Sequence, residues 1–340
     1  MTRLVSRPAH SSASIVDMTM NLYTYPVVLI AHHLKFFEYI ALKPRSINDI
    51  CGRMALHSRP VEAIMATLRA LNLVHLEGEI YTLTAQTEEY LLPESPHYFG
   101  YFWDLMYENS DNFSVKHLEQ AISKNHAQVY DEVDIFEAHV ERAEMARTFT
   151  HAMHSLSMGT ASVWATQSFL EQHREVLDIG GGSGAHAISV AANWPQIKST
   201  IFDLAEICPL TEEYIQQYQL SGRVNTYAGD MWKDNYPPAD LHIYSNIFHD
   251  WTDEKNRFLA EKSFTALPSG GRIVIHEVLY HDETPGPLAA AALSLVMLGW
   301  TEGRQYSGQQ ISEILTQAGF GNIEIMPSNG HYSIVVGQKI

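Results

Sequence analysis

A glycine-rich segment from Asp178 to Gly184, DIGGGSG, carries the clearest chemical signal in this sequence. It follows a strand-like apolar run and precedes a helical pattern. Glycines let the backbone approach a ligand closely, and the free N–H groups at a helix N-terminus attract anions. Gly182, Gly184 and Ala187 also satisfy the G-x-G-x-x-A pattern of dinucleotide-binding proteins. The segment alone therefore predicts a nucleotide-containing cofactor and leaves a nicotinamide dinucleotide open.

Acidic residues near this segment favour S-adenosylmethionine over the dinucleotide. Asp178 suits a cationic amino-acid group, whereas it would repel a pyrophosphate. Asp203 ends the next strand-like run, where it can bind both hydroxyls of a ribose. Asp230 and Met231 follow the third run, and an acid beside an apolar thioether suits the amine and the face of an adenine. The loop also lies in the second half of the chain, after a helical region, and this position favours S-adenosylmethionine as well.

Five motifs occur in the order VLDIGGGSG, FDL, GDM, NIFHDWTDE and GRIVIHEVL. This ordered set resembles the caffeate and hydroxyindole O-methyltransferase family over nearly the whole chain. The resemblance implies an S-adenosylmethionine-dependent methyltransferase that acts on a small molecule as a homodimer. It implies a helical winged-helix domain for dimerisation and pocket closure over residues 1–168, and a Rossmann-like catalytic domain over residues 169–340. The expected donor-binding residues are Asp178, Gly180, Gly182, Asp203, Leu204, Asp230, Met231 and Ser245.

The resemblance places His249, in IFHDW, at the general-base position of the family. Imidazole suits this task because its ordinary pKa, about 6.5, lets it take a proton from a phenol or alcohol near neutral pH. His249 is one of 18 histidines, so composition alone would make it structural. Glu277 matches the acid that flanks the base in plant members. Its other interpretation is a strand-end carboxylate with a structural hydrogen bond.

Two positions depart from the pattern of the plant members. Gln305 stands where a second acid flanks the base, and Ser245 stands where a lysine precedes the base. The machinery for methylating a phenol is therefore incomplete. Metal chemistry is not expected, because His151 and His154, three residues apart on a helix, make a weak pair of ligands.

Arg304 is expected to mark the acceptor pocket. A guanidinium binds a carboxylate through paired hydrogen bonds, so Arg304 predicts an acidic small-molecule substrate. An ion pair with Glu302 or Glu313 would explain the same residue structurally. The further substrate-binding residues expected from the resemblance are Trp103, Met153, His154, Met297 and Trp300.

Within the family, IVDMTMNLYTYPVVLIAHHL and SLVMLGWTEGRQYSG are similar to segments of the bacterial methylthiohydroxybutyrate S-methyltransferases of dimethylsulfoniopropionate synthesis. A thioether has no proton to remove, so positioning and desolvation can replace base catalysis. S-methylation of 4-methylthio-2-hydroxybutyrate is therefore the leading hypothesis. O-methylation of a phenol or hydroxy acid, with His249 as base, is the alternative. A non-catalytic regulator that binds a ligand or DNA is the third hypothesis.

The elements that must position these residues change character near residue 170. In the second half, strand-like runs such as EVLDIG, STIFDL, DLHIYSNI and GRIVIHEVLY alternate with helical stretches. This series predicts a mostly parallel sheet with helices on both faces and ligands at the carboxyl ends of its strands. The apolar run from Pro287 to Trp300 is too short to cross a bilayer and is expected to be a buried helix.

The pattern of the first half predicts helices, with a helix–helix–hairpin order over residues 46–84 that is typical of a winged helix. A winged helix that binds DNA needs cations on the helix that enters the major groove. Residues 59–76 offer only Arg59 and Arg69 against Glu62. A structural or dimerisation role is therefore expected.

The overall composition agrees with these expectations. The chain has 22 basic and 39 acidic residues among 340, a formal net charge of −17, and such a surface repels phosphate backbones and anionic lipid. Neither nucleic acid nor a membrane is an expected partner. The start of the chain lacks the apolar stretch of an export signal. Two cysteines, Cys51 and Cys208, make no disulfide framework, so a cytoplasmic location is expected.

Overall fold

The computed structural model describes residues 8–127, 143–284 and 286–340, and the chain divides into two compact units, Met1–Glu108 and Asn109–Ile340. This boundary lies well before the predicted one after residue 168. The cause is packing: α9 (Ala143–Trp164) lies along α10 (Ala185–Asn193), and α7 (Val115–Lys124) contacts α13 (Leu288–Trp300). Both α7 and α9 thus belong to the C-terminal unit, although they precede its first strand.

Helices and one hairpin make up the N-terminal unit. Its elements are α1 (Ala13–His33), α2 (Phe36–Leu42), α3 (Ile47–Met54), α4 (Ser58–Ala70), β1 (Val74–Glu77), β2 (Ile80–Leu83), α5 (Ala85–Leu91) and α6 (Gly100–Glu108). The predicted order of helix, helix and hairpin is present as α3, α4 and the antiparallel pair β1 and β2. Ser46 caps α3, because its side chain accepts a hydrogen bond from the Asp49 N–H while the Asp49 carboxylate accepts one from the Ser46 N–H.

A seven-stranded mixed sheet forms the centre of the C-terminal unit, which confirms the predicted fold class. Its strands are β3 (Glu175–Ile179), β4 (Lys198–Asp203), β5 (Val224–Ala228), β6 (Leu241–Ser245), β7 (Arg272–Val278), β8 (Gly321–Pro327) and β9 (Tyr332–Gln338), in the order β5-β4-β3-β6-β7-β9-β8. The first five strands in this order pair in parallel. β9 is antiparallel to both β7 and β8, and this terminal hairpin was not predicted from the sequence.

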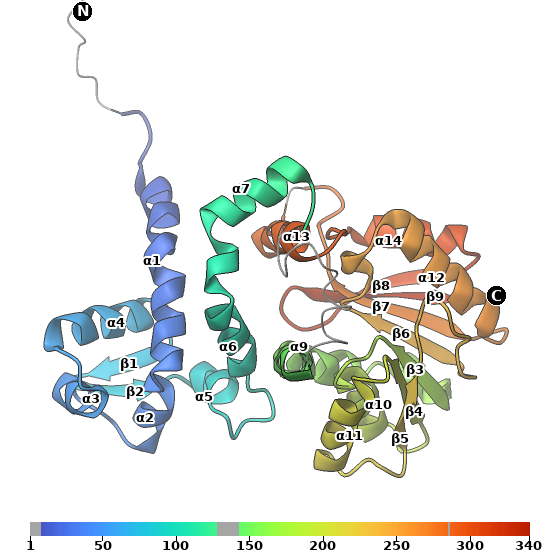
Figure 1. Ribbon diagram of the computed structural model, residues 1–340, viewed down its shortest axis with the longest axis horizontal. Coiled ribbons are helices and arrows are strands. Elements are labelled where there is room, and N and C mark those ends of the chain that lie inside the picture. Colours follow the sequence, from blue (N-terminus) through green and yellow to red (C-terminus); the bar gives the residue numbers. More distant parts are fainter. Residues whose placement is uncertain (1–7, 128–142, 285) are drawn as a thin grey trace, which may run out of the picture. The chain divides into compact units, whose positions relative to one another are not determined.

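Helices cover both faces of this sheet (Figure 1). α12 (Asp253–Ala266) and α14 (Gly308–Gln317) supply side chains to the core on one face. α9, α10 and α11 (Cys208–Gln217) supply them on the other. Two covered faces explain why the central strands are nearly continuous apolar runs.

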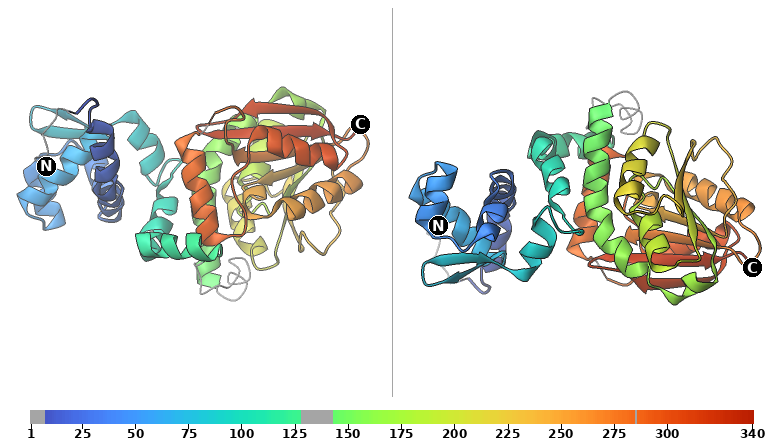
Figure 2. Two further views of the ribbon diagram at one scale, coloured as in Figure 1. Left: turned by 90° about the horizontal axis from the view of Figure 1, so that it is seen from above. Right: turned by 90° about the horizontal axis from the view of Figure 1, so that it is seen from below.

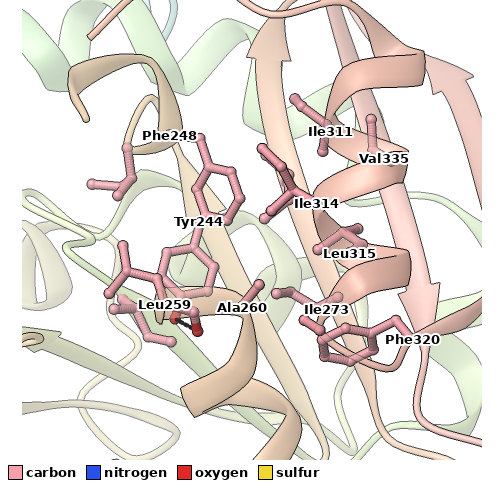
Figure 3. Close-up of a cluster of buried hydrophobic side chains, with 14 of the residues drawn as sticks. Tyr244, Phe248, Leu259, Ala260, Ile273, Ile311, Ile314, Leu315, Phe320 and Val335 are labelled. Carbon is pink, nitrogen blue, oxygen red and sulfur yellow. Dashed lines mark hydrogen bonds between the residues drawn. The ribbon is translucent and has the colours of Figure 1, made fainter. Parts of the chain in front are cut away.

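Successive strand residues divide between the two layers. Leu177 packs into the core beneath α12 and α14, whereas its neighbour Val176 packs with Trp164 of α9. Figure 3 shows the first layer, where Tyr244 of β6 lies near Leu259 of α12, and Leu315 of α14 lies near Phe320. Side-chain alternation therefore fixes the register of every parallel strand relative to both helical layers.

The helix α13 differs from the fully buried helix that its composition predicts. Among its 13 residues only Ala290, Met297 and Trp300 are buried, while Leu288 is 84% and Leu295 is 46% exposed. α13 is attached along one side only, where it contacts α7 and the turn that contains His249 (Figure 2). Among the described residues, no helix combines the length and the apolar character that a bilayer crossing requires.

Candidate active site

The carboxyl ends of five parallel strands meet at one edge of the sheet. The strand order reverses between β3 and β6, and such a reversal opens a crevice where α/β proteins bind ligands. The glycine loop leaves β3 at this edge, Asp203 ends β4, and Asp230 follows β5. Ser245 ends β6, and Glu277 lies near the end of β7. The topology therefore brings the predicted donor-binding and catalytic motifs to the same edge.

The glycine loop adopts a conformation that only glycine tolerates well. Gly180, Gly182 and Gly184 have φ angles of 65°, 55° and 76°, in the left-handed region. The Gly180 N–H donates to the Phe202 carbonyl at 2.8 Å, which ties the loop to β4. A Cβ placed on Gly182 would meet no atom within 4 Å, so the loop leaves open space at this position.

Asp178 packs against the glycine loop, and its predicted role as a partner of a ligand ammonium group stays a prediction. Its side chain is fully buried, and one carboxylate oxygen accepts a hydrogen bond from the Ala187 N–H at 3.1 Å. Burial raises the pKa of Asp178 to about 7. A Cβ on Gly181 would approach the Asp178 carboxyl carbon to 2.7 Å, so loop and carboxylate are packed together. This position supports the loop from below.

Asp203 connects the ends of β3 and β4 at the surface of the site. Its Oδ2 accepts a hydrogen bond from the Gly182 N–H at 2.7 Å, and its Oδ1 accepts one from the Leu204 N–H at 2.7 Å. Burial raises the pKa of Asp203 to about 6, so the group remains mostly ionised at pH 7. A carboxylate oxygen can accept more than one hydrogen bond. Asp203 can therefore hold the loop and two ligand hydroxyls at once.

The remaining predicted donor-binding residues follow β5 and β6. Asp230 forms an ion pair with Lys233 at 2.7 Å; burial raises the pKa of Asp230, but this ammonium helps to hold it below its ordinary value. Met231 is half-buried and packs against the core on the face covered by α12 and α14. Ser245 Oγ lies 3.0 Å from His276 Nδ1. Asp230 and Ser245 thus both have partners within the protein.

These residues fit S-adenosylmethionine. The open space over Gly182, the half-buried Asp203 and the half-buried Met231 follow one another along the edge of the sheet. In addition, Oδ1 of the buried Asp178 has no hydrogen-bond partner among the described residues. The arrangement offers backbone N–H groups, a ribose partner and an apolar surface to one ligand. No group of three or more metal-ligating side chains occurs in the described part of the chain.

His249 lies in the short helix η4 (Phe248–Asp250) that follows β6. Its Nδ1 is 3.0 Å from Oε2 of Glu277 and 2.9 Å from the Gln305 side-chain amide. Burial of the ring lowers its pKa, but Glu277 and Asp250 outweigh that effect and raise the pKa of His249 to about 9. With Nδ1 turned to Glu277, Nε2 is the nitrogen left for proton transfer, and it lies 3.6 Å from Asp250 Oδ1. The predicted pairing of His249 with Glu277, and the predicted location of Gln305 beside the base, are both present.

Residues that sequence reasoning missed fix the turn that carries His249. The Asn256 side chain donates hydrogen bonds to the carbonyls of Phe248 at 2.7 Å and Trp251 at 3.3 Å. Gly303 packs against the same turn, and a Cβ there would overlap the backbone of His249. A buried asparagine inside a helix is itself a weak signal, because asparagine is a poor helix former that needs polar partners. No local signal marks Gly303.

Arg304 is paired within the protein, and its predicted role as a carboxylate clamp stays a prediction. Its guanidinium donates to both carboxylate oxygens of Asp253 at 3.2 and 3.3 Å and lies 4.4 Å from the centre of the Tyr306 ring. The structural interpretation as an ion pair is therefore the one realised, with Asp253 in place of the expected glutamates. Glu302 pairs with Lys255 at 2.6 Å.

Arg304 lines a cavity of about 600 Å³ outside α13. Trp251, Tyr280 and Leu298 line the same cavity, whereas its described lining includes neither His249 nor Glu277.

The other predicted substrate-binding residues are dispersed. Trp103 lies in the N-terminal unit, where its ring centre is 6.1 Å from that of Phe99. Met297 and Trp300 are each 8% exposed on the attached side of α13. Met153 is half-buried on α9. His154 is buried and contacts Ser183 of the glycine loop, and its predicted contact with the acceptor stays a prediction.

Comparisons with known proteins agree with this geometry. Residues 115–321 match the model of the O-methyltransferase domain family. The chain is 29% identical to a 3-hydroxy-5-methyl-1-naphthoate 3-O-methyltransferase of Streptomyces sahachiroi, over 96% of this chain and 94% of that protein. It is 28% identical to an acetylserotonin O-methyltransferase of Gallus gallus, over 87% and 88%.

A solved structure shares the fold over the whole length. Human N-acetylserotonin methyltransferase, in complex with S-adenosylmethionine, has a TM-score of 0.85 and 24% sequence identity, and the match covers 98% of this chain and 99% of that one. The family model matches more than half of the chain and spans the glycine loop, Asp203 and His249. The chain therefore belongs to the O-methyltransferase family and is an S-adenosylmethionine-dependent methyltransferase.

Proposed function

We propose that this enzyme methylates an oxygen atom of a small phenol or hydroxy acid, with His249 as the general base. The observation that carries the proposal is the buried pair of His249 Nδ1 and Glu277 Oε2, 3.0 Å apart, at the edge that also carries the donor motifs. An acid on Nδ1 fixes the ring and leaves Nε2 to take a proton. The named activities of the relatives in Streptomyces sahachiroi and Gallus gallus support an oxygen acceptor.

The protein's own contribution to this reaction is positioning and proton transfer. S-adenosylmethionine supplies an electrophilic methyl group, and the acceptor hydroxyl must lose its proton as the new O–C bond forms. His249 Nε2 takes this proton, and the charge that develops on the ring is stabilised by Glu277 and Asp250. The Gln305 side-chain nitrogen lies 2.9 Å from the same Nδ1, and because an Nδ1–H that donates to Glu277 has no lone pair to offer, Gln305 is a buried neighbour of the ring and not a second hydrogen-bond partner. Because these groups are buried, bulk water does not compete for the proton.

A second candidate is S-methylation of 4-methylthio-2-hydroxybutyrate. One observation favours it: the pKa of His249 is raised to about 9, so the ring is mostly a cation at neutral pH and is then suited to hold a hydroxyl or carboxylate. The amide of Gln305, where plant members carry an acid, and Ser245 in place of lysine agree with an acceptor that needs no base. Neither the family model nor the relatives named above support this narrower assignment, and Arg304 is occupied by Asp253.

We also propose that the N-terminal unit mediates homodimer formation. Its helix α1 exposes several large apolar side chains, and water-exposed apolar faces of this kind are typical of protein interfaces. They are Ile15 (61% exposed), Val16 (50%), Met18 (64%), Leu22 (65%) and Tyr23 (68%). Sedimentation equilibrium should give twice the 38.4 kDa chain mass, and a lysine at Leu22 should shift the equilibrium to the monomer.

A panel of acceptors tests the choice between oxygen and sulfur. The enzyme is incubated with labelled S-adenosylmethionine and, in parallel, with naphthols, hydroxy acids and 4-methylthio-2-hydroxybutyrate. Oxygen methylation predicts a labelled methyl ether and little label in the thioether. A labelled sulfonium, with no ether formed, would overturn the main proposal and support the second candidate. S-adenosylhomocysteine release, measured in the same samples, confirms that turnover accompanies labelling.

A further inference from the structure

A buried histidine of α9 contacts the glycine loop. His154 Nδ1 lies 2.8 Å from Ser183 Oγ, and the two residues are 8% and 3% exposed. Ser183 is the only residue between Gly180 and Gly184 that has a side chain beyond Cα. This contact is therefore the one side-chain attachment that the loop sequence permits.

The same imidazole also contacts the helix that follows Asp203. Its ring stacks on Tyr214 of α11 with ring centres 3.9 Å apart, and its Nε2 lies 3.3 Å from the Tyr218 hydroxyl. α11 touches the loop a second time, because the Thr211 hydroxyl donates to the Gly182 carbonyl at 2.6 Å. His154 thus joins three segments: α9, the loop after β3 and the helix after β4.

The chemistry of this contact suits a permanent attachment. Desolvation lowers the pKa of His154 to about 3, so the ring stays neutral at physiological pH. A neutral imidazole has one N–H donor and one acceptor nitrogen, and these match the hydroxyls of Ser183 and Tyr218. The contact therefore does not depend on protonation in the range where the enzyme works.

We propose that His154 is a positioning residue for the methyl donor, and that it acts by holding Ser183 and with it the glycine loop. Three of the five loop residues have positive φ angles, and glycines in such a loop lose much conformational freedom when a ligand orders them. An attachment that orders the loop beforehand reduces this cost and increases donor affinity. The proposal rests on the cofactor assignment and is independent of the acceptor.

The chain offers a matched control on the opposite face of the sheet. His242 Nδ1 lies 3.0 Å from Ser263 Oγ, and neither residue is exposed. Desolvation lowers the pKa of His242 to about 3 as well. The pair joins β6 to α12 and has the same chemistry and burial, but it does not touch the loop. Losing it measures the effect of a broken histidine–serine contact on stability alone.

The experiment measures binding of S-adenosylhomocysteine by calorimetry to His154→Ala, Ser183→Ala and the double variant. Each single variant should bind about 10-fold more weakly, the typical loss of a buried hydrogen bond, and the double variant no more weakly than the worse single one. In turnover assays the KM for the donor should rise while kcat at saturating donor stays within about two-fold. His154→Asn, which retains a polar group near the Nδ1 position, should recover most of the affinity.

The controls decide between positioning and simple destabilisation. His242→Ala and Ser263→Ala should lower Tm but leave affinity for S-adenosylhomocysteine within about two-fold of the original protein. Unchanged affinity of Ser183→Ala would overturn the proposal, as would losses in the single variants that multiply in the double variant. An equal loss of affinity in the His242 control would overturn it too. Ser183→Ala removes a single hydroxyl, so it provides the decisive measurement if His154→Ala does not fold.

Discussion

The donor half and the base half of the active site are assembled in different ways. In the donor half, neighbouring motif residues bond to one another's backbone: Gly182 N–H to Asp203, and Asp203 to Leu204 N–H. In the base half, side chains from distant segments converge on His249, with Glu277 28 residues away and Gln305 56 residues away. The donor half is therefore built from short motifs at the ends of adjacent strands, although Gly182 and Asp203 themselves lie 21 residues apart. A site built from converging side chains depends on topology.

Removal of the imidazole tests the base half and has the largest expected effect. On an oxygen acceptor, His249→Ala should lower kcat by about 10²–10⁴-fold, because no group then takes the hydroxyl proton. Affinity for S-adenosylhomocysteine should not change, since the donor half does not include this ring. Labelled-methyl assays and calorimetry measure the two quantities.

A control for this variant lies at the opposite edge of the sheet. His173 Nδ1 is 3.1 Å from Asp240, a histidine–acid pair in which the histidine is buried and the side chain of Asp240 is 31% exposed. His173→Ala should lower Tm and leave kcat unchanged. On a thioether acceptor, His249→Ala should weaken acceptor binding instead of turnover. A kcat loss below about three-fold on an oxygen acceptor would remove His249 from the role of base.

Removal of the carboxylate that joins β3 to β4 tests the donor half. Asp203→Ala leaves the Gly182 and Leu204 N–H groups without their acceptor and takes away the proposed ribose partner. Affinity for S-adenosylmethionine should fall by roughly 1–3 kcal/mol, the usual cost of unpaired buried polar groups. Asp203→Asn, which keeps one acceptor oxygen, should lose less. Wild-type affinity in Asp203→Ala, measured by calorimetry, would contradict the donor assignment.

The pH dependence of turnover sharpens the contrast, because the pKa of His249 in the base half, about 9, lies above those of Asp178, about 7, and Asp203, about 6, in the donor half. Burial lowers the pKa of His249, but Glu277 and Asp250 raise it to about 9. The neutral ring is the base, so kcat/KM on an oxygen acceptor should rise with pH up to about 9. Glu277→Gln removes one charge and should move this rise to lower pH. Gln305→Glu adds a charge beside Nδ1 and should move it to higher pH.

The same shift predicts the pH dependence of stability. The pKa of His249 lies higher in the folded chain than its ordinary value of about 6.5. Its ion pair therefore stabilises the fold fully below pH 6.5, and this contribution is lost as the pH rises through 9. Chemical denaturation should show the loss in the original protein and a smaller one in Glu277→Gln. For the rate profiles, a rise of kcat/KM over the same pH range in Glu277→Gln and in Gln305→Glu would show that a group other than His249 titrates.

The sequence predicted the parallel strands and the donor motifs well, because these features depend on short-range patterns and not on side chains that converge from distant segments. Gly180, Gly182 and Asp203 lie at strand ends, where short-range pattern and topology agree. The contacts that His154 makes on α9, and that Arg304 makes in the loop before α14, were not predicted, because the direction of each side chain depends on how its segment packs. Arg304 meets Asp253, 51 residues away, and no spacing rule relates the two. Gln305 was placed correctly because alignment to relatives already contains the topology.

Substitution of Arg304 has the smallest expected effect, and it tests whether the cavity that Arg304 lines belongs to the acceptor-binding site. Its side chain is 44% exposed and that of Asp253 is 57% exposed, so their ion pair should contribute less than about 1 kcal/mol to stability. Arg304→Ala should therefore lower Tm by a few degrees at most, and the Kd of an acid acceptor and of its matching amide should stay equal to those of the original protein. Arg304→Lys keeps the charge but loses the paired hydrogen bonds to Asp253, so its Tm should lie between that of the original protein and that of Arg304→Ala. If Arg304→Ala instead weakened binding of the acid by 30-fold or more and spared the amide, the guanidinium would have to leave Asp253 and reach the acceptor. The cavity that Arg304 lines would then belong to the acceptor-binding site. An acidic acceptor, which the sequence predicted, would become the preferred substrate class in place of a neutral phenol.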